Sequence, residues 1–393
     1  MEYNPFLPEV RENPYPYFAY LREHAPVYQV PGVGFWAVSR YDDVLSIVKN
    51  PQMFSSTMLV SALVGELSPW TPQAPPFIAT DPPDHTRVRK LANRAFTPRR
   101  IASLETHLRE VVRQLLEPIP AQGTFDLVQE LAAPLPSIAI AELLGVPTDR
   151  RKDFKRWATD IVYAMNGTAL TDDERARIRR SHSEFRTYFQ EAIETCRKHP
   201  SDTLLSDLVR AEEENQTLTA EEVHSLALLL IGAGNETTTN LIGSAVLTLL
   251  NNPDQFAKVR ANPALLSQTV EEALRYESPV QVWPRQAMQD VEIAGTALPA
   301  GSFVMVMFGS ANRDENKFPA PDRFDILRNT EGQVGFGFGI HFCLGAPLAR
   351  LETKLALEGL LARFPRLTRT DEPFTRIVNP FFRGLTALPL AVA

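Results

Sequence analysis

A cysteine, a histidine, three phenylalanines and three glycines lie in one short stretch, residues 336–345, with the sequence FGFGIHFCLG. Cys343 is one of two cysteines in the chain, and an apolar pattern of helical period follows it directly. At a helix N-terminus, unpaired N–H groups and the helix dipole favour the thiolate form of a cysteine. Gly337 and Gly339 let the backbone approach a large flat group. A thiolate between Phe336 and Phe342 therefore has the chemistry of an axial ligand to a haem iron.

The same stretch also allows plainer interpretations. A lone cysteine between Phe342 and Leu344 is more often a small buried hydrophobic residue than a ligand. The glycines can form an ordinary loop, and Gly335-x-Gly337 resembles the start of a dinucleotide motif. No strand-then-helix pattern with a third glycine at the right position supports a dinucleotide site. Taken alone, this stretch leaves two roles open for Cys343, that of a ligand and that of a core residue.

Composition and charge narrow the class of protein. The chain has 393 residues, 44% of them hydrophobic and 22% charged, as in a globular protein with ample material for a core. Its net charge of −7 argues against nucleic acid as a partner, because no basic excess is present to neutralise phosphates. The two cysteines are far apart and indicate a reducing cytoplasm. The sequence has no run of about eighteen apolar residues, so it predicts no membrane anchor.

Short-range patterns predict a small β-rich part followed by a helical one. Strands at 27–30 and 35–38, with helices at 14–24 and 41–49, place the β-rich part within about residues 1–55. Helical periods dominate from residue 81 onward, with capping boxes that begin helices at Thr171 and Thr219. Between these parts, residues 55–80 are rich in proline and apolar side chains. This segment is either an irregular surface loop or the lining of a pocket.

Two further patterns place polar groups where chemistry could use them. His85 and Arg89 are four residues apart on a predicted helix, so they share a face and form either an anion site or a surface pair. Residues 232–240, GAGNETTTN, are a poor helix sequence in the middle of a long apolar helix. They predict either a notch at a functional site, or a kink tolerated for packing with Glu236 in an ion pair elsewhere.

Taken in order along the chain, these motifs resemble those of the cytochrome P-450 superfamily. Phe336, Gly339, Cys343 and Gly345 match its signature Phe-x-x-Gly-x-x-x-Cys-x-Gly. The resemblance implies a mainly α fold with small β-sheets, in a single triangular-prism-like domain over residues 1–393. It also implies a haem b (iron protoporphyrin IX) with the thiolate of Cys343 as the axial ligand of the iron.

The resemblance assigns roles to other residues by their match to the family's motifs. Glu236 and Thr237 match the acid–alcohol pair, in which the acid passes protons inward and the alcohol hydrogen-bonds to bound dioxygen. Glu272 and Arg275 match Glu-x-x-Arg, with Arg323 as the third member of a buried cluster that supports the cysteine loop. Five further residues are expected to contact the haem: His85, Arg89, Arg285, Phe336 and His341. Six others are expected to contact the substrate: Trp70, Phe77, Ala233, Val282, Trp283 and Phe381.

The resemblance implies haem-thiolate monooxygenation as the function. One oxygen atom of O2 would be inserted into a lipophilic small molecule, by hydroxylation or epoxidation, and a fatty acid, terpenoid, steroid or polyketide remain equally open. The chain carries no flavin or iron–sulfur motif, so an iron–sulfur ferredoxin and a ferredoxin reductase are the expected electron donors. We expect a cytoplasmic bacterial monomer that binds neither membrane nor nucleic acid. Peroxide-driven oxygenation, which Glu236 and Thr237 disfavour, and a non-catalytic haem sensor or carrier are the alternatives.

Overall fold

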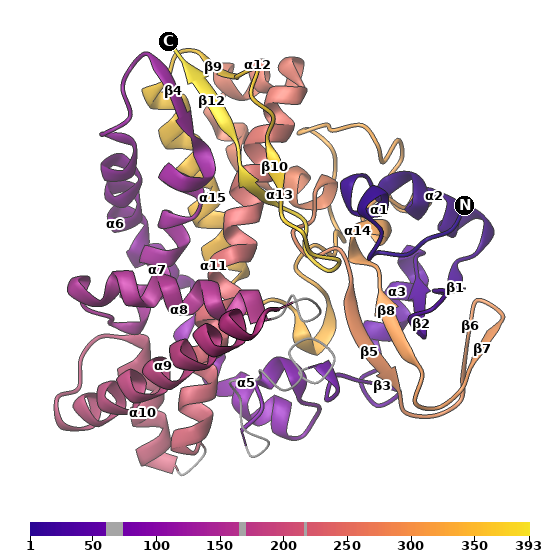
Figure 1. Cartoon of the computed structure of the whole chain (residues 1–393), viewed down its shortest axis with the longest axis horizontal. Coiled ribbons are helices and arrows are strands. Elements are labelled where there is room, and N and C mark those ends of the chain that lie inside the picture. Colours follow the sequence, from indigo (N-terminus) through magenta and orange to yellow (C-terminus); the bar gives the residue numbers. More distant parts are fainter. Residues whose placement is uncertain (60–73, 165–169, 216–217) are drawn as a thin grey trace. The chain divides into compact units, whose positions relative to one another are not determined.

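The computed structural model describes residues 1–59, 74–164, 170–215 and 218–393. Helices dominate these residues, and the strands among them form four small sheets (Figure 1). The chain divides into two compact units. The first unit consists of residues 1–55, 104–135 and 237–393, and the second of residues 56–103 and 136–236. The single domain expected from the sequence stays a prediction.

The largest sheet belongs to the first unit and has the strand order β1-β2-β8-β5-β3. β2 pairs in parallel with β8, and the other neighbours are antiparallel. Its apolar side chains pack with those of helix α3 into one buried core, so the strands predicted at 27–30 and 35–38 and the helix predicted at 41–49 are confirmed. The elements are β1 (Val27–Gln29), β2 (Phe35–Val38), α3 (Tyr41–Lys49), β3 (Phe54–Ser55), β5 (Trp283–Ala287) and β8 (Phe303–Val306).

Three smaller sheets complete the strands of the described chain. The C-terminal strand β12 lies between β4 and β9, so it joins segments that are far apart in the sequence. The other two sheets are hairpin-like pairs, β6 with β7 and β10 with β11. The strands are β4 (Gly123–Asp126), β6 (Val291–Ile293), β7 (Thr296–Leu298), β9 (Leu367–Arg369), β10 (Thr375–Arg376), β11 (Leu385–Ala387) and β12 (Pro389–Val392).

The remaining elements of the first unit are helical. α15 begins directly after the cysteine loop and packs against α13. These elements are α1 (Pro8–Glu12), α2 (Tyr15–His24), the π-helix η3 (Val128–Ala132), α12 (Pro253–Ala261), η5 (Pro263–Leu265), α13 (Leu266–Tyr276), α14 (Phe308–Ala311), η6 (Gly339–His341) and α15 (Ala346–Arg363). α6 (Pro98–Leu116), α7 (Pro134–Leu144) and α11 (Ala220–Asn251) each contribute residues to both units.

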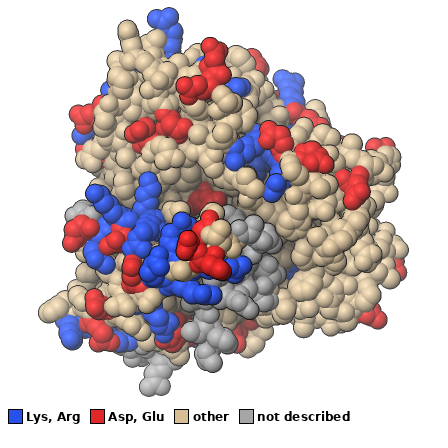
Figure 2. All heavy atoms as spheres, in the orientation of Figure 1, with Lys and Arg blue, Asp and Glu red and all other residues tan. Residues whose placement is uncertain are grey.

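The helix that begins after Thr171, in the second unit, is capped as the sequence predicts. The hydroxyl of Thr171 accepts a hydrogen bond from the Glu174 N–H, and the Glu174 carboxylate accepts one from the Thr171 N–H, which confirms a capping box. α8 and α9 lie side by side, and Figure 2 shows basic and acidic side chains mixed over them. The elements are η2 (Phe77–Ala79), α5 (Asp84–Ala95), η4 (Thr148–Arg150), α8 (Arg151–Ala164), α9 (Asp172–Lys198) and α10 (Leu204–Asn215).

The long helix α11 runs without interruption through the glycine-rich stretch. The N–H of Glu222 donates to the Thr219 hydroxyl at its start, as the predicted capping box requires. A Cβ atom added to Gly232 would lie 3.1 Å from Ile161, and one added to Gly234 would lie 2.8 Å from Ile140. The two glycines therefore let α11 pack closely against α8 and α7. None of the described helices combines the length and the apolar character that crossing a bilayer requires.

Candidate active site

Backbone hydrogen bonds fix the shape of the loop that carries Cys343. The N–H of Gly337 donates to the Val334 carbonyl at 2.9 Å, and the N–H of Cys343 donates to the Phe336 carbonyl at 2.9 Å. Gly337 and Gly339 have φ angles of +70° and +72°, which other residues adopt only with strain. α15 begins at Ala346, three residues after Cys343. The cysteine thus lies just ahead of a helix N-terminus, at the end of a loop of consecutive turns.

The loop rests on helix α3. A Cβ atom at Gly339 would lie 2.6 Å from the Val48 carbonyl oxygen, so only glycine allows this close approach. The Lys49 ammonium lies 5.3 Å from the centre of the Phe338 ring, which adds a cation–π contact. Because residues of α3 belong to the buried core of the large sheet, the loop is anchored to that core.

A buried ion pair lies under the segment that precedes the loop. Arg275 donates two hydrogen bonds, at 2.7 and 2.8 Å, to the carboxylate of Glu272, and both side chains are fully buried. The prediction that Arg323 is the third member of this buried cluster is wrong: its side chain is 66% exposed and lies toward Asp325. Arg328 takes that place, with its Nε 3.3 Å from the Glu272 carboxylate.

The turn after Pro321 explains this correction. The backbone carbonyl of Arg323 points inward and accepts hydrogen bonds from Arg275 and Arg328, so its own side chain must point outward. The Arg328 guanidinium is only 10% exposed and also donates to the Ala320 carbonyl. A buried carboxylate is therefore held by two arginines, one of which also fixes the backbone of this turn.

Two of the predicted propionate ligands belong to the first unit. Arg285 lies on β5 with its backbone paired to Val304, its side chain is buried, and its Nη1 donates to the Pro284 carbonyl at 2.8 Å. His341 lies in the short turn η6 of the cysteine loop and is partly buried. Arg285 is a permanent cation, and a buried one gains most from a carboxylate partner.

The other two predicted propionate ligands lie together in the second unit. His85 is 2% exposed, and its ring is 5.9 Å from that of Phe77. The Arg89 guanidinium lies 5.7 Å from the same Phe77 ring, and its Nε donates to the side chain of Asn93. The shared helix face predicted for His85 and Arg89 is therefore covered by one aromatic ring. Phe77, predicted as a substrate contact, is the residue that brings them together.

The middle turn of α11 differs from the turns on either side of it. Residues 226–231 and 238–249 are buried, whereas Ala233 between them is exposed. Glu236 follows on the same helix, and burial alone raises the pKa of its carboxyl from the usual 4.5 to about 7. Thr237 is the next residue and is partly buried. α11 therefore presents a small residue to open space one turn from a carboxyl that can hold or release a proton near neutral pH.

Two chain segments predicted to line the substrate pocket lie side by side in the first unit. The Gln281 N–H donates to the Phe381 carbonyl at 2.8 Å, and the ring of Trp283 packs against that of Phe382 at 5.9 Å. Val282 is buried, and Phe381 is 9% exposed. The structure thus pairs the two predicted segments, while Trp70 lies outside the described residues. Their contact with a substrate stays a prediction.

The residues of the cysteine loop fit a haem. A Cβ atom at Gly345 would lie 4.0 Å from the Cys343 sulfur, so glycine keeps the space beside that sulfur clear. The Arg350 guanidinium lies over the Phe336 ring, 4.6 Å from its centre. The Phe336 and Phe342 rings pack edge to face, with 6.3 Å between their centres. A soft sulfur donor between aromatic rings is a known haem ligand type. Arg285 supplies a buried cation of the kind that a propionate requires.

The sequence analysis missed one buried acid of the same unit. Glu352 on α15 is 1% exposed, one of its carboxylate oxygens has no hydrogen-bond partner, and burial raises its pKa well above the usual value. Its neighbours Leu348 and Leu355 mark the buried face of α15, so a helical period could have flagged the acid. Arg328 lacked even this signal because it lies in an irregular segment.

The fold and the site define a mainly helical protein with a cysteine loop that suits haem, and comparison with known proteins agrees. Residues 5–383 match the family model described as cytochrome P450. The chain is 40% identical to the vitamin D(3) 25-hydroxylase of Pseudonocardia autotrophica over 97% of this chain and 94% of that protein. The structure of cytochrome P450 CYP109Q5 from Chondromyces apiculatus superposes with a TM-score of 0.93, at 43% identity, over 100% of this chain and 98% of that one.

A third relative is CYP109E1 from Bacillus megaterium, solved in complex with testosterone. It has a TM-score of 0.87 and 36% identity, and the match covers 97% of this chain and 98% of that one. The chain therefore belongs to the cytochrome P450 family, whose members are haem-thiolate monooxygenases that use O2 and electron-donor partners. The resemblance read from residues 336–345 is confirmed at the level of family and fold.

Proposed function

We propose that this protein binds haem b through the thiolate of Cys343 and inserts one oxygen atom of O2 into a lipophilic small molecule. The observation that carries the proposal is the cysteine loop, whose backbone bonds hold Cys343 just ahead of α15 with glycine beside its sulfur. A haem bound there supplies the activation of dioxygen, with the thiolate increasing the electron density that favours O–O cleavage. The side chains around it have separate tasks.

Glu236 and Thr237 move and position protons. A carboxyl with a pKa of about 7 gives up and regains a proton easily at neutral pH, which is what a relay from solvent needs. The hydroxyl of Thr237 can both accept and donate a hydrogen bond, so it can orient the acceptor of that proton. Ala233, one turn earlier, leaves room for the substrate on the exposed side of the helix.

The remaining residues hold the cofactor and the guest. His85, Arg89, Arg285 and His341 bind the two propionates of the haem, and Phe336 packs beside it. Val282, Trp283 and Phe381, together with Trp70 and Phe77, form the apolar walls of the substrate pocket. A vitamin D hydroxylase and a testosterone complex among the relatives support a lipophilic guest of steroid size. An iron–sulfur ferredoxin and its reductase supply the electrons, and the enzyme acts as a cytoplasmic monomer.

The spectrum of the reduced protein with carbon monoxide tests the ligand. Wild-type protein should show the strongly red-shifted Soret band of a thiolate opposite carbon monoxide, and Cys343→Ala should lose it. Cys196→Ala is the matched control, because Cys196 is the other cysteine of the chain and lies on α9. A Cys343→Ala variant that keeps the red-shifted band would overturn the assignment of this cysteine.

The electron source is tested by comparing two ways of driving the reaction. With a ferredoxin, its reductase and a steroid or fatty acid, we expect oxygenated product whose new oxygen atom derives from labelled O2. Turnover with hydrogen peroxide but with no ferredoxin system would replace this proposal by peroxide-driven oxygenation. Normal reduction with no product from any guest would favour a haem sensor or carrier.

A further inference from the structure

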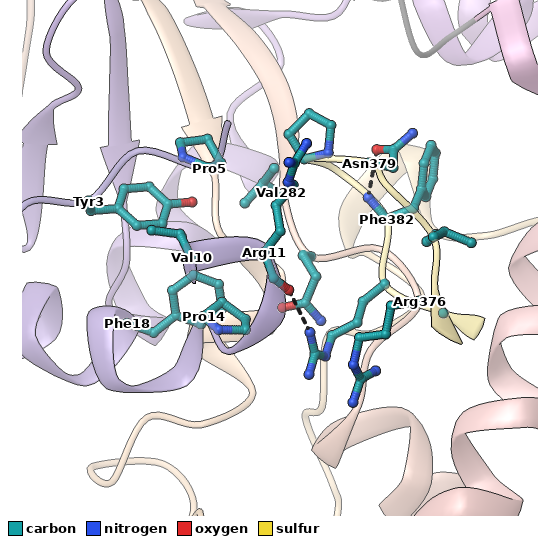
Figure 3. Close-up of a pocket in the computed structure, with 15 residues that line it drawn as sticks. Tyr3, Pro5, Val10, Arg11, Pro14, Phe18, Val282, Arg376, Asn379 and Phe382 are labelled. Atoms are coloured by element: carbon teal, nitrogen blue, oxygen red, sulfur yellow. Dashed lines mark hydrogen bonds between the residues drawn. The ribbon is translucent and has the colours of Figure 1, made fainter. Parts of the chain in front are cut away.

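A cleft in the first unit shares only Val282 with the residues of the proposed function. Its residues come from the N-terminal 18 residues, from residues 281–282 and from residues 376–384. Figure 3 shows Tyr3, Val10 and Phe18 along one wall and Arg376 with Phe382 along the other. The cleft is partly open to solvent. It can therefore admit a small group from solvent.

The charges that line this cleft are all positive. Its fifteen lining residues include Arg11, Arg376 and Arg383 and no acidic residue. Arg383 is neutralised by Glu277, 2.6 Å away, and also donates to the Arg11 carbonyl (Figure 3). Arg376 differs, because within the described part of the chain it forms no ion pair and its buried Nε has no hydrogen-bond partner. The cleft thus holds one arginine whose charge is not matched.

The surroundings of Arg376 make this unmatched charge costly. Burial lowers the pKa of the Arg376 guanidinium, and the nearby charge of Arg383 lowers it further. Glu277, Tyr15 and Glu12 act in the opposite direction but more weakly. The guanidinium also lies 5.2 Å from the Phe374 ring, which contributes only modestly at a partly exposed site. A bound anion would offset both the burial and the repulsion from Arg383.

The rest of the lining indicates what the anion is attached to. Most of the lining residues are apolar, among them Tyr3, Val10, Val282, Ile377 and Phe382. A free inorganic anion would gain nothing from these side chains, whereas an apolar chain would bury surface against them. A planar guanidinium also matches the two oxygens of a carboxylate, with which it forms paired hydrogen bonds.

We propose that this cleft binds the carboxylate of an amphipathic small molecule, with Arg376 as its ion-pair partner and its apolar body along Val10, Ile377 and Phe382. The site does not depend on haem binding or on the proposed oxygenation. It would hold its ligand through unit 1 alone, since every lining residue belongs to that unit.

Calorimetric titration of the full-length protein as purified, with octanoate as the probe, tests this site. We expect Arg376→Gln to weaken octanoate binding by about 10–100-fold, the range for loss of a charged hydrogen-bonding partner. Arg376→Lys, which keeps the charge without the planar fork, should lose less. Arg366→Gln is the matched control, because it removes an exposed arginine of the same unit outside the cleft, and it should leave the affinity unchanged. Equal affinity in wild type and Arg376→Gln would overturn the proposal.

Two further probes separate the parts of the proposed ligand. Octanol has the same chain without the charge, and inorganic phosphate has charge without the chain. Each should bind at least tenfold more weakly than octanoate, and either one matching octanoate would overturn the proposal. The Soret band, recorded during each titration, identifies octanoate that enters beside the haem. Loss of affinity in Arg376→Gln must therefore occur without a change in the octanoate-induced Soret shift.

The stability of the variant distinguishes a binding residue from a structural one. Without octanoate, Arg376→Gln should melt at or above the wild-type temperature, because the substitution removes an unmatched, partly buried charge. With octanoate, only the wild-type protein and Arg366→Gln should gain stability. A melting temperature of Arg376→Gln well below that of Arg366→Gln would show that Arg376 serves the fold, and would overturn the binding role.

Discussion

Replacing Glu236 by glutamine tests the electrostatics of α11 directly. Glutamine has nearly the same shape as protonated glutamic acid but cannot ionise, so the substitution removes one titration and little else. Burial holds the pKa of Glu236 at about 7 in the folded chain, against 4.5 for an ordinary glutamic acid. The native protein therefore favours the neutral carboxyl, and ionising it opposes folding.

The sign and size of the effect follow from this difference in pKa. Between pH 4.5 and about 7 the folded protein binds more protons at Glu236 than the unfolded chain, so stability falls as pH rises through this window. Above pH 7 both states are ionised and the loss is complete. At 1.36 kcal/mol per unit of pKa, the full loss is about 3 kcal/mol. Glu236→Gln should not show this loss of stability, because glutamine does not ionise.

Denaturant unfolding at pH 5 and at pH 8 measures the effect. At pH 5 the wild-type protein and Glu236→Gln should differ in stability by less than about 1 kcal/mol, and at pH 8 the variant should be more stable by about 3 kcal/mol. Glu130→Gln is the control, because Glu130 is an exposed acid, and its difference from wild type should not change with pH. A wild-type protein that loses no more stability than Glu236→Gln between pH 5 and pH 8 would refute the reasoning.

Three other substitutions address the loop, its support and the relay. Thr237→Ala should keep its fold but consume electrons without forming an equal amount of product; unchanged coupling of electron use to product would contradict its role. Arg328→Ala should destabilise the protein by about 1–3 kcal/mol because Glu272 loses a buried partner. The control Arg323→Ala, at an exposed side chain, should change the stability by no more than about 0.5 kcal/mol. Equal losses of stability in thermal melts of the two variants would contradict this. Gly339→Ala should cost at least about 1–2 kcal/mol, from its positive φ and the approach to α3, and an unchanged melting temperature would be inconsistent with that.

Local patterns in the sequence predicted the elements that local forces determine. The helix expected at 41–49 has those bounds in the structure, and the capping boxes at Thr171 and Thr219 begin the expected helices. The cysteine loop was also predictable, because its glycines, its aromatic residues and the following helix are contiguous. In each case the physical cause acts between residues less than a few turns apart.

The features that sequence did not predict depend on contacts across the chain. Arg323 and Arg328 lie in one short irregular segment, and only the path of its backbone decides which of them reaches Glu272. The cleft around Arg376 joins the first 18 residues to the last 20, and no periodic pattern connects them. For Glu236, the alternatives were a functional acid and an ion pair. The pKa shift has burial as its only cause, which favours the first.

The cysteine loop separates the residues that determine its shape from those that face outward. Its path is set by backbone hydrogen bonds and two glycines, while the Phe338 and Phe342 side chains are 37% and 39% exposed. A substitution of Phe338 can therefore change the outer surface of the loop and leave the sulfur in place. The exposed surface of the loop can thus be changed while its backbone path stays the same.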